Sequence, residues 1–135
     1  MLGEKIGEFT GKITGQRVLP SHEGAARVET SFQASGKLLG IEVQEMGTYC
    51  GEMRPGGTIY GEGQGVIMTK DGEGATWTGS GYGKLTGKGM GASYRGVLYF
   101  KTNSAKLARL NSVCVIFEHD CDENGNTKDQ TWEWR

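Results

Sequence analysis

The stretch of sequence that decides the fold is GTIYGEGQGVIMTKDGEGATWTGSGYGKLTGKGMGASYRGVLYF, residues 57–100. Glycine occupies every second position at 61, 63 and 65, again at 79, 81 and 83, and again at 87, 89 and 91. A period of two is typical of a β-strand, because successive side chains point to opposite faces. Rows of glycine allow a sheet to coil sharply and let other groups approach its backbone. The stretch therefore predicts three strongly curved antiparallel strands, and such curvature favours closure into a barrel.

Alternating segments continue on both sides of this stretch. The predicted strands are 6–18, 26–35, 38–53, 58–69, 75–86, 91–102, 112–120 and 127–134. Turn signals separate them, among them Asp71-Gly72 and Asn124-Gly125, which are typical of hairpins. Only residues 103–110 have helical character, over one or two turns. We therefore predict an all-β fold, with residues 1–135 forming a single domain. That domain is an eight-stranded antiparallel up-and-down barrel, closed by pairing of the N-terminal strand with a late one.

The composition excludes several classes of partner. The chain has 15 Lys+Arg and 16 Asp+Glu and no block of like charge, so we expect no nucleic-acid partner. It has no long apolar run and no basic segment leading into one, so we expect neither a membrane partner nor a signal peptide. The cysteines at 50, 114 and 121 are an odd, widely spaced set. They fit a reducing cytosol, and we expect a cytoplasmic protein.

Residues 120–125, DCDENG, match the opening of a calcium-binding loop. Thr131 stands where such a loop has its bidentate glutamate, and strands rather than helices are predicted on both sides. A type I′ hairpin turn with acidic residues explains the same letters, and we favour it. We therefore expect no bound metal.

The glycine spacings at 61–65 and 79–83 resemble only part of a dinucleotide-binding fingerprint, which needs a helix directly after it. No helix is predicted there, so we expect architectural glycines and no cofactor. His22, His119 and the cysteines have no sequence context typical of a nucleophilic triad. Cys114 is expected to be a small core residue.

Candidate site residues lie on the face of strand 58–69 opposite its glycine row. If that face points inward, Glu62 lies in a mixed apolar pocket, where a carboxylate can act as an acid or a base. The alternative, which we favour while the register is open, is that Glu62 faces solvent or pairs with Arg95. On the inward arrangement the candidate catalytic residue is Glu62, and the candidate ligand-binding residues are Tyr49, Tyr60, Gln64, Met68, Tyr94, Arg95 and Glu118.

One further pattern runs through residues 59–100. The residues that carry it are Ile59, Gly61 to Gly65, Asp71-Gly72, Gly74 to Thr76, Gly79 and Gly83 to Lys88. In these turns and glycines the chain resembles small bacterial proteins with the allene oxide cyclase-like barrel, over about a third of its length. The resemblance implies an eight-stranded barrel with a central cavity, often found as an oligomer. Plant enzymes of that fold cyclise an unsaturated fatty-acid epoxide without a cofactor, but none of their active-site residues aligns here, so that activity is not carried over.

Three functions follow from a barrel of this size. The first is binding of a small, largely apolar molecule in the central cavity. The second is a cofactor-independent isomerase or cyclase that uses the same cavity, with Glu62 as its acid or base. The third is a structural or interaction protein whose barrel is filled by side chains. The volume of the cavity distinguishes the third from the other two.

Self-association is expected from the segment 112–120. It is apolar on both faces, with Val113, Val115 and Phe117 on one and Cys114 and Ile116 on the other. One short helix is too small to cover its outer face together with that of its neighbours. Exposed apolar patches of this kind mark contact surfaces, so we expect a homo-oligomer, with a dimer favoured.

Overall fold

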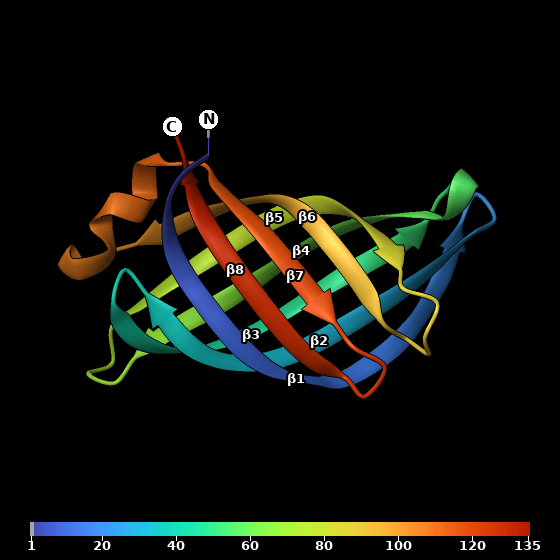
Figure 1. Ribbon diagram of the computed structural model, residues 1–135, viewed down its shortest axis with the longest axis horizontal. Coiled ribbons are helices and arrows are strands. Elements are labelled where there is room, and N and C mark those ends of the chain that lie inside the picture. Colours follow the sequence, from blue (N-terminus) through green and yellow to red (C-terminus); the bar gives the residue numbers. More distant parts are fainter. Residues whose placement is uncertain (1) are drawn as a thin grey trace.

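In the computed structural model, which describes residues 2–135, eight antiparallel strands form a closed barrel (Figure 1). Each strand pairs with the next along the chain, and β8 returns to pair with β1. The predicted all-β, eight-stranded up-and-down barrel is therefore confirmed. The strands and 3-10 helices are β1 (Leu2–His22), β2 (Ala25–Leu38), β3 (Ile41–Met53), η1 (Pro55–Gly57), β4 (Thr58–Thr69), β5 (Gly74–Leu85), β6 (Ala92–Thr102), η2 (Ala105–Ser112), β7 (Val115–Cys121) and β8 (Asn126–Trp134).

Strand β1 is longer than the predicted segment 6–18. It pairs with β2 along most of its length and with β8 in its first half. Its register with β2 shifts between Ile13 and Gly15 and again between Leu19 and His22. Such irregularities bend a strand and interrupt its alternation, which is why the alternating pattern ended before the strand does.

One end of the barrel is closed by η2. The predicted helical segment 103–110 is present as a 3-10 helix over Ala105–Ser112. Leu107 and Leu110 are fully buried and belong to the main core of the barrel. The side chain of Asn111 exchanges hydrogen bonds with the backbone of Thr102, at 2.8 and 3.0 Å, and so fastens η2 to the end of β6.

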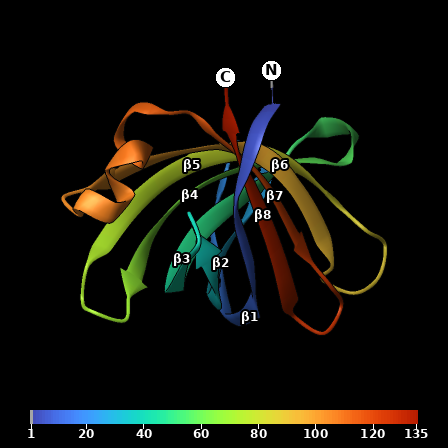
Figure 2. The same ribbon diagram turned by 60° about the vertical axis from the view of Figure 1, so that its left-hand side comes forward.

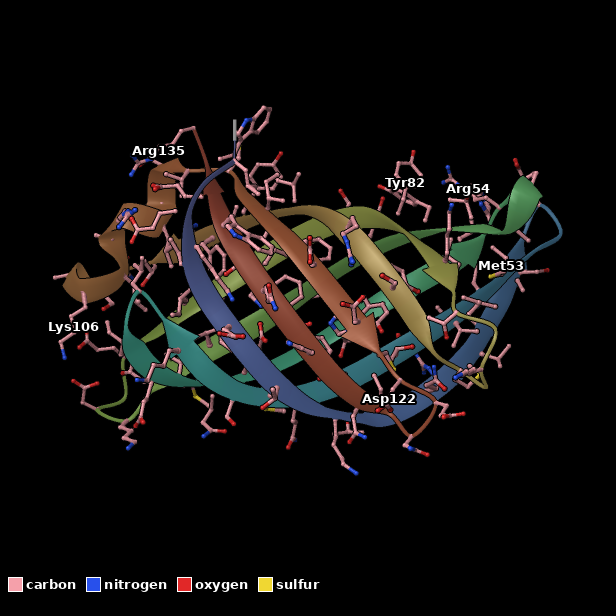
Figure 3. The ribbon with its side chains drawn as sticks, in the orientation of Figure 1. Met53, Arg54, Tyr82, Lys106, Asp122 and Arg135 are labelled. Atoms are coloured by element: carbon pink, nitrogen blue, oxygen red, sulfur yellow. The ribbon has the colours of Figure 1, made fainter. Side chains whose placement is uncertain are left out.

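The opposite end of the barrel carries η1 and the turns β1–β2, β5–β6 and β7–β8. In two views, η1 and η2 lie at opposite ends of the molecule (Figures 1 and 2). Met53 and Asp122 lie at the η1 end, whereas Lys106 lies on η2 (Figure 3). Among residues 2–135, no helix is long and apolar enough to cross a membrane.

The glycine rows of β4 and β5 form part of the inner surface of the barrel. A Cβ atom at Gly65 would overlap the indole ring of Trp77, and one at Gly83 would come within 2.5 Å of the Tyr94 ring. The rows therefore make room for large rings that point inward from neighbouring positions. This arrangement positions the aromatic residues of the site described next.

Candidate functional site

Two cavities reach the interior aromatic residues, and a third pocket, of about 640 Å³, is lined by residues of β1 to β6, many of them on the outer face. The inner cavity, of about 70 Å³, is surrounded by rings and aliphatic groups but also reached by Glu45, His119, Asp129 and Thr131. The mouth cavity, of about 420 Å³, lies between it and the η1 end. Its apolar lining comes from Ile13, Val28, Met53, Ile59, Leu85 and Met90. The barrel is thus neither solid nor hollow throughout, and its polar interior groups gather at the inner cavity.

His119 and Asp129 form a buried pair. They lie directly opposite each other on β7 and β8, a register determined by the turn Asp122–Asn126. Directly opposed residues on one face have neighbouring side chains, and here Nδ1 of His119 contacts Oδ1 of Asp129. Both residues are only 6% exposed. Because an ionised carboxylate can only accept, Nδ1 carries the proton and donates it to Asp129.

Tyr49 extends this pair toward the mouth cavity. Its hydroxyl lies 3.3 Å from Nε2 of His119, and the two rings meet edge to face at 5.4 Å. With Nδ1 protonated, Nε2 of the neutral ring is an acceptor, so the Tyr49 hydroxyl donates to it. Burial raises the pKa of Tyr49 well above its ordinary value. The chain Tyr49–His119–Asp129 can therefore pass a proton between the mouth cavity and the buried carboxylate.

Glu45 is a second buried acid at the inner cavity. Nε1 of Trp77 donates a hydrogen bond to its Oε2 at 2.9 Å. Burial, and then the nearby Asp129, raise the pKa of Glu45 to about 8. The hydroxyl of Thr131 lies in the same cavity wall, buried and without a hydrogen-bond partner among residues 2–135. Uncompensated polar groups in an apolar interior are costly, which marks this cavity as a functional candidate.

Tyr49 and Tyr94 stand between the two cavities and line both. Their ring centroids are 5.4 Å apart and the rings meet edge to face. Burial raises the pKa of Tyr94 to about 12. Both phenols therefore keep their protons near neutral pH, and they form the floor of the mouth cavity.

The structure brings two of the predicted site residues together and separates the others. Tyr49 and Tyr94 point into the barrel, as their place in both cavity walls shows. Glu62 belongs to the wall of the inner cavity, but its side chain is exposed and accepts a hydrogen bond from the Tyr60 hydroxyl at 2.7 Å. Four of the remaining candidates lie on the outer face, away from the pockets: Tyr60, Met68, Arg95 and Glu118. Gln64 is also exposed and lines a separate pocket of about 640 Å³.

The inward arrangement of Glu62 is therefore wrong, and its solvent-facing alternative is the one found. Its expected partner Arg95 instead contacts Glu118 at 3.7 Å and Asp120 at 3.2 Å on the outer face. The physical reason for the outward position of Glu62 is that interior rings pack against the glycine rows. Interior rings occupy the space above these glycines, so the residues between them are forced outward, Glu62 among them.

Sequence reasoning missed Glu45, His119 and Asp129 as members of one site. The signal for Glu45 was present, because it shares a strand face with Val43, Gly47 and Tyr49, where a single carboxylate among apolar neighbours is unusual. His119 and Asp129 were harder to connect, because their contact depends on the exact register of one hairpin.

The acidic turn between β7 and β8 is held together by hydrogen bonds to the carboxylate of its own residue Asp122. Oδ1 of Asp122 accepts hydrogen bonds from the backbone N–H groups of Asn124 and Asn126, at 2.8 and 2.9 Å. Gly125 has φ of 80°, a conformation that favours glycine. Over residues 2–135, no group of three or more His, Cys, Asp or Glu side chains is arranged to hold a metal ion. The structure gives this segment the form of a hairpin turn.

Comparisons with known proteins identify relatives by structure. No family model matches the sequence, and no curated protein matches it. A protein of unknown function from Clostridium acetobutylicum ATCC 824 has a TM-score of 0.82 at 12% identity, over 98% of both chains. A beta-barrel like protein from Acinetobacter baumannii AYE has a TM-score of 0.82 at 11% identity, over 100% of this chain and 96% of its own. An enzyme from Penicillium herquei has a TM-score of 0.66 at 16% identity, over 98% and 96%.

At these identities the likeness shows the fold alone. The chain is a small β-barrel protein with the same architecture as these structures.

Proposed function

We propose that the protein binds a small, largely apolar molecule in its mouth cavity and rearranges it by proton transfer, as a cofactor-independent isomerase or cyclase. The observation that carries this proposal is the buried chain of Tyr49, His119 and Asp129, which ends at the floor of that cavity. A structural barrel would be more stable with apolar side chains at these positions, because burying ionisable groups costs free energy. Buried ionisable groups of this kind are found most often at functional sites.

The chemistry follows from the direction of the hydrogen bonds. In the resting chain, the proton of Tyr49 points at Nε2 of His119. The Tyr49 oxygen also has a side-chain hydrogen bond with Thr30 in the cavity wall, which leaves one lone pair for a substrate proton. A substrate proton moves to the Tyr49 oxygen as the proton of Tyr49 moves to Nε2. The resulting imidazolium is stabilised by the Asp129 carboxylate. The reverse transfer returns a proton to another atom of the substrate, so the net result is an isomerisation that needs no cofactor.

The lining of the mouth cavity supports the apolar substrate. Apolar groups make up the larger part of its wall, with Gln16, Thr30, Glu123 and Asn124 as the polar ones, and its volume of about 420 Å³ falls within the range of small-molecule sites. The inner cavity of about 70 Å³ is too small for such a molecule. We therefore assign the substrate to the mouth cavity and the proton chain to its floor.

Two other observations support this proposal. The resemblance to allene oxide cyclase-like barrels implies a central cavity, and one structural relative is described as an enzyme. We propose membership of that family on the turn and glycine pattern together with the fold. The second candidate function is a carrier that binds the same molecule without changing it, which the large apolar mouth cavity alone would satisfy.

Native mass spectrometry of the protein purified from its own host tests the proposal first. A copurified small molecule is expected, and it then serves as the substrate. Incubation with wild type should convert it to an isomer of equal mass, and Tyr49→Phe should lower kcat by roughly 10²- to 10⁴-fold. Tyr99→Phe, on the outer face of β6, is the matched control and should retain full activity. Binding with no conversion by wild type would support the carrier instead.

A further inference from the structure

Tyr94 has a phenolic hydroxyl without a hydrogen-bond partner among residues 2–135. This hydroxyl is not sealed off from the cavity, because the fully buried side-chain oxygens without a partner in this part of the chain are those of Thr127 and Thr131. The residue is 8% exposed, and none of the hydrogen bonds found in residues 2–135 involves its phenolic oxygen. A Cβ atom added at Gly51 would lie 3.2 Å from this oxygen, which places it beside Gly51 in the wall of the mouth cavity. A hydroxyl that is open to the cavity and has no protein partner can donate a hydrogen bond to a ligand bound there, and that bond adds to the affinity.

The proton of Tyr94 is the free phenolic donor at the cavity floor, because the proton of Tyr49 is directed at His119. A ligand atom opposite Tyr94 must therefore accept a hydrogen bond. Of the described residues that line the mouth cavity, Glu123 alone carries a charge. No cation is present there to offset a ligand carboxylate, and burying one would be costly. The acceptor that fits is a neutral oxygen.

We propose that Tyr94 selects ligands with a neutral carbonyl group, such as a ketone or an enone, by donating a hydrogen bond to the carbonyl oxygen. This inference rests on the proposed function and names its substrate class. The proposed proton transfer favours a carbonyl group over other neutral oxygen acceptors in the ligand. A C–H bond next to a carbonyl is acidic enough for a tyrosine–histidine chain to break.

The step balances without an oxidant or a reductant. The C–H bond breaks, its proton goes to Tyr49, and its electron pair moves onto the carbonyl oxygen as an enolate. Tyr94 then faces developing negative charge, and a preorganised donor in a dry site stabilises such charge strongly. The raised pKa of Tyr94, about 12, keeps it a donor throughout the neutral range.

Three probes with one ring system test the inference by calorimetric titration: 2-acetylnaphthalene, 2-ethylnaphthalene and 2-naphthoate. The ketone should bind wild type about tenfold more tightly than the hydrocarbon, the gain of one net hydrogen bond. The carboxylate should bind most weakly of the three. Tyr94→Phe should remove the advantage of the ketone and leave the affinity for the hydrocarbon unchanged. Tyr99→Phe should behave as wild type.

The outcomes separate this inference from the proposed function. Equal affinities for ketone and hydrocarbon in wild type would overturn the role of Tyr94 and leave an apolar site in place. A failure of all three probes to bind would overturn both, because the mouth cavity would then not accept apolar molecules. Tightest binding of the carboxylate would also overturn the inference. The ratio of the ketone and hydrocarbon affinities in wild type tests the role of Tyr94 even if the Tyr94 variant does not fold.

Discussion

Gly65 on β4 lies directly opposite Trp77 on β5, and the indole ring covers the glycine so closely that no side chain fits between them. The same indole donates its N–H to Glu45, 2.9 Å away. The missing side chain at position 65 therefore determines where the ring lies, and the ring positions a buried acid of the inner cavity. A glycine in the fold and a carboxyl in the candidate site are linked through one tryptophan.

Gly65→Ala should destabilise the protein by roughly 1–3 kcal/mol, because the added methyl group displaces a packed ring. The matched control is Gly15→Ala on β1, where a Cβ atom would meet nothing within 4 Å. The free energy of unfolding of that variant should lie within about 0.5 kcal/mol of the wild-type value. Urea denaturation followed by tryptophan fluorescence measures both. Equal stabilities of the two variants would show that the Trp77 ring is free to move.

The barrel could be predicted from the sequence because the features that indicate it each lie within a short segment of the chain. Alternation, glycine rows and hairpin turns each act over a few residues, and eight such segments joined by short turns have few other arrangements. The choice of inner and outer face needed information from further away. On β4 either face could have pointed into the barrel, since Glu62 and Gln64 alternate with glycines, which have no side chain to indicate the inner face. Only the rings that reach in from β2, β5 and β6 determine that the glycine face is the inner one.

The candidate site was predictable in part. Tyr49 and Tyr94 were among the candidates expected to reach the interior in one register, and both line the cavities. The pair His119 and Asp129 was not predictable, because a shift of the β7–β8 register by one residue would turn one of the two side chains to the opposite face and separate them. The buried carboxyl group with a raised pKa that was expected at Glu62 is found instead at Glu45, one strand away.

Glu45 should make the stability of the protein fall as the pH rises. Its pKa is raised from 4.5 to about 8 on folding, so between these values the folded state holds a proton that the unfolded state has lost. The stability due to this group is complete below pH 4.5 and is lost as the pH rises through about 8. At about 1.4 kcal/mol per pKa unit, the loss is a few kcal/mol.

Glu45→Gln isolates this effect, since the amide oxygen can still accept from Trp77 but does not titrate. Urea denaturation at pH 5.5 and at pH 8.5 should show wild type losing more stability than the variant between the two conditions. The variant should be the more stable protein at the higher pH. A parallel pH dependence of the two proteins would mean that Glu45 ionises as easily in the fold as in the unfolded chain.

Asp129→Asn should reverse the direction of the proton chain. Asparagine keeps the size of the residue, but its amide can donate to Nδ1 of His119 and so move the ring proton to Nε2. The Tyr49 hydroxyl would then have to accept from the ring rather than donate to it. Conversion of substrate should fall by roughly 10⁴-fold with little change in binding, as expected for a wrong tautomer.

The tautomer itself is measurable without a substrate. Long-range ¹H–¹⁵N NMR spectra of ¹⁵N-histidine protein should show Nδ1 protonated in neutral wild-type His119 and Nε2 protonated in Asp129→Asn. His22, which lies on the exposed side of β1 beside Glu52, provides the internal reference. An Nε2-protonated ring in wild type would contradict the proposed direction of the chain.

Self-association should involve the outer face of β7. Ile116 there lies between Val97 on β6 and Trp132 on β8, and these three pairing residues form an apolar row across three strands. Trp134 and Leu2 continue the apolar surface at one end and are 54% and 53% exposed. Two copies that bring this row together about a two-fold axis would bury it on both sides, and closed dimers are the commonest such assembly.

Analytical ultracentrifugation should therefore give about twice the chain mass of 14.6 kDa for wild type. Ile116→Glu should give a monomer, because it places an unpaired charge at the centre of the contact. Val66→Glu is the matched control, since Val66 is an exposed apolar residue on the outer face of β4. A dimer that survives Ile116→Glu but dissociates with Val66→Glu would assign the contact to β4, and a monomeric wild type at high concentration would contradict self-association altogether.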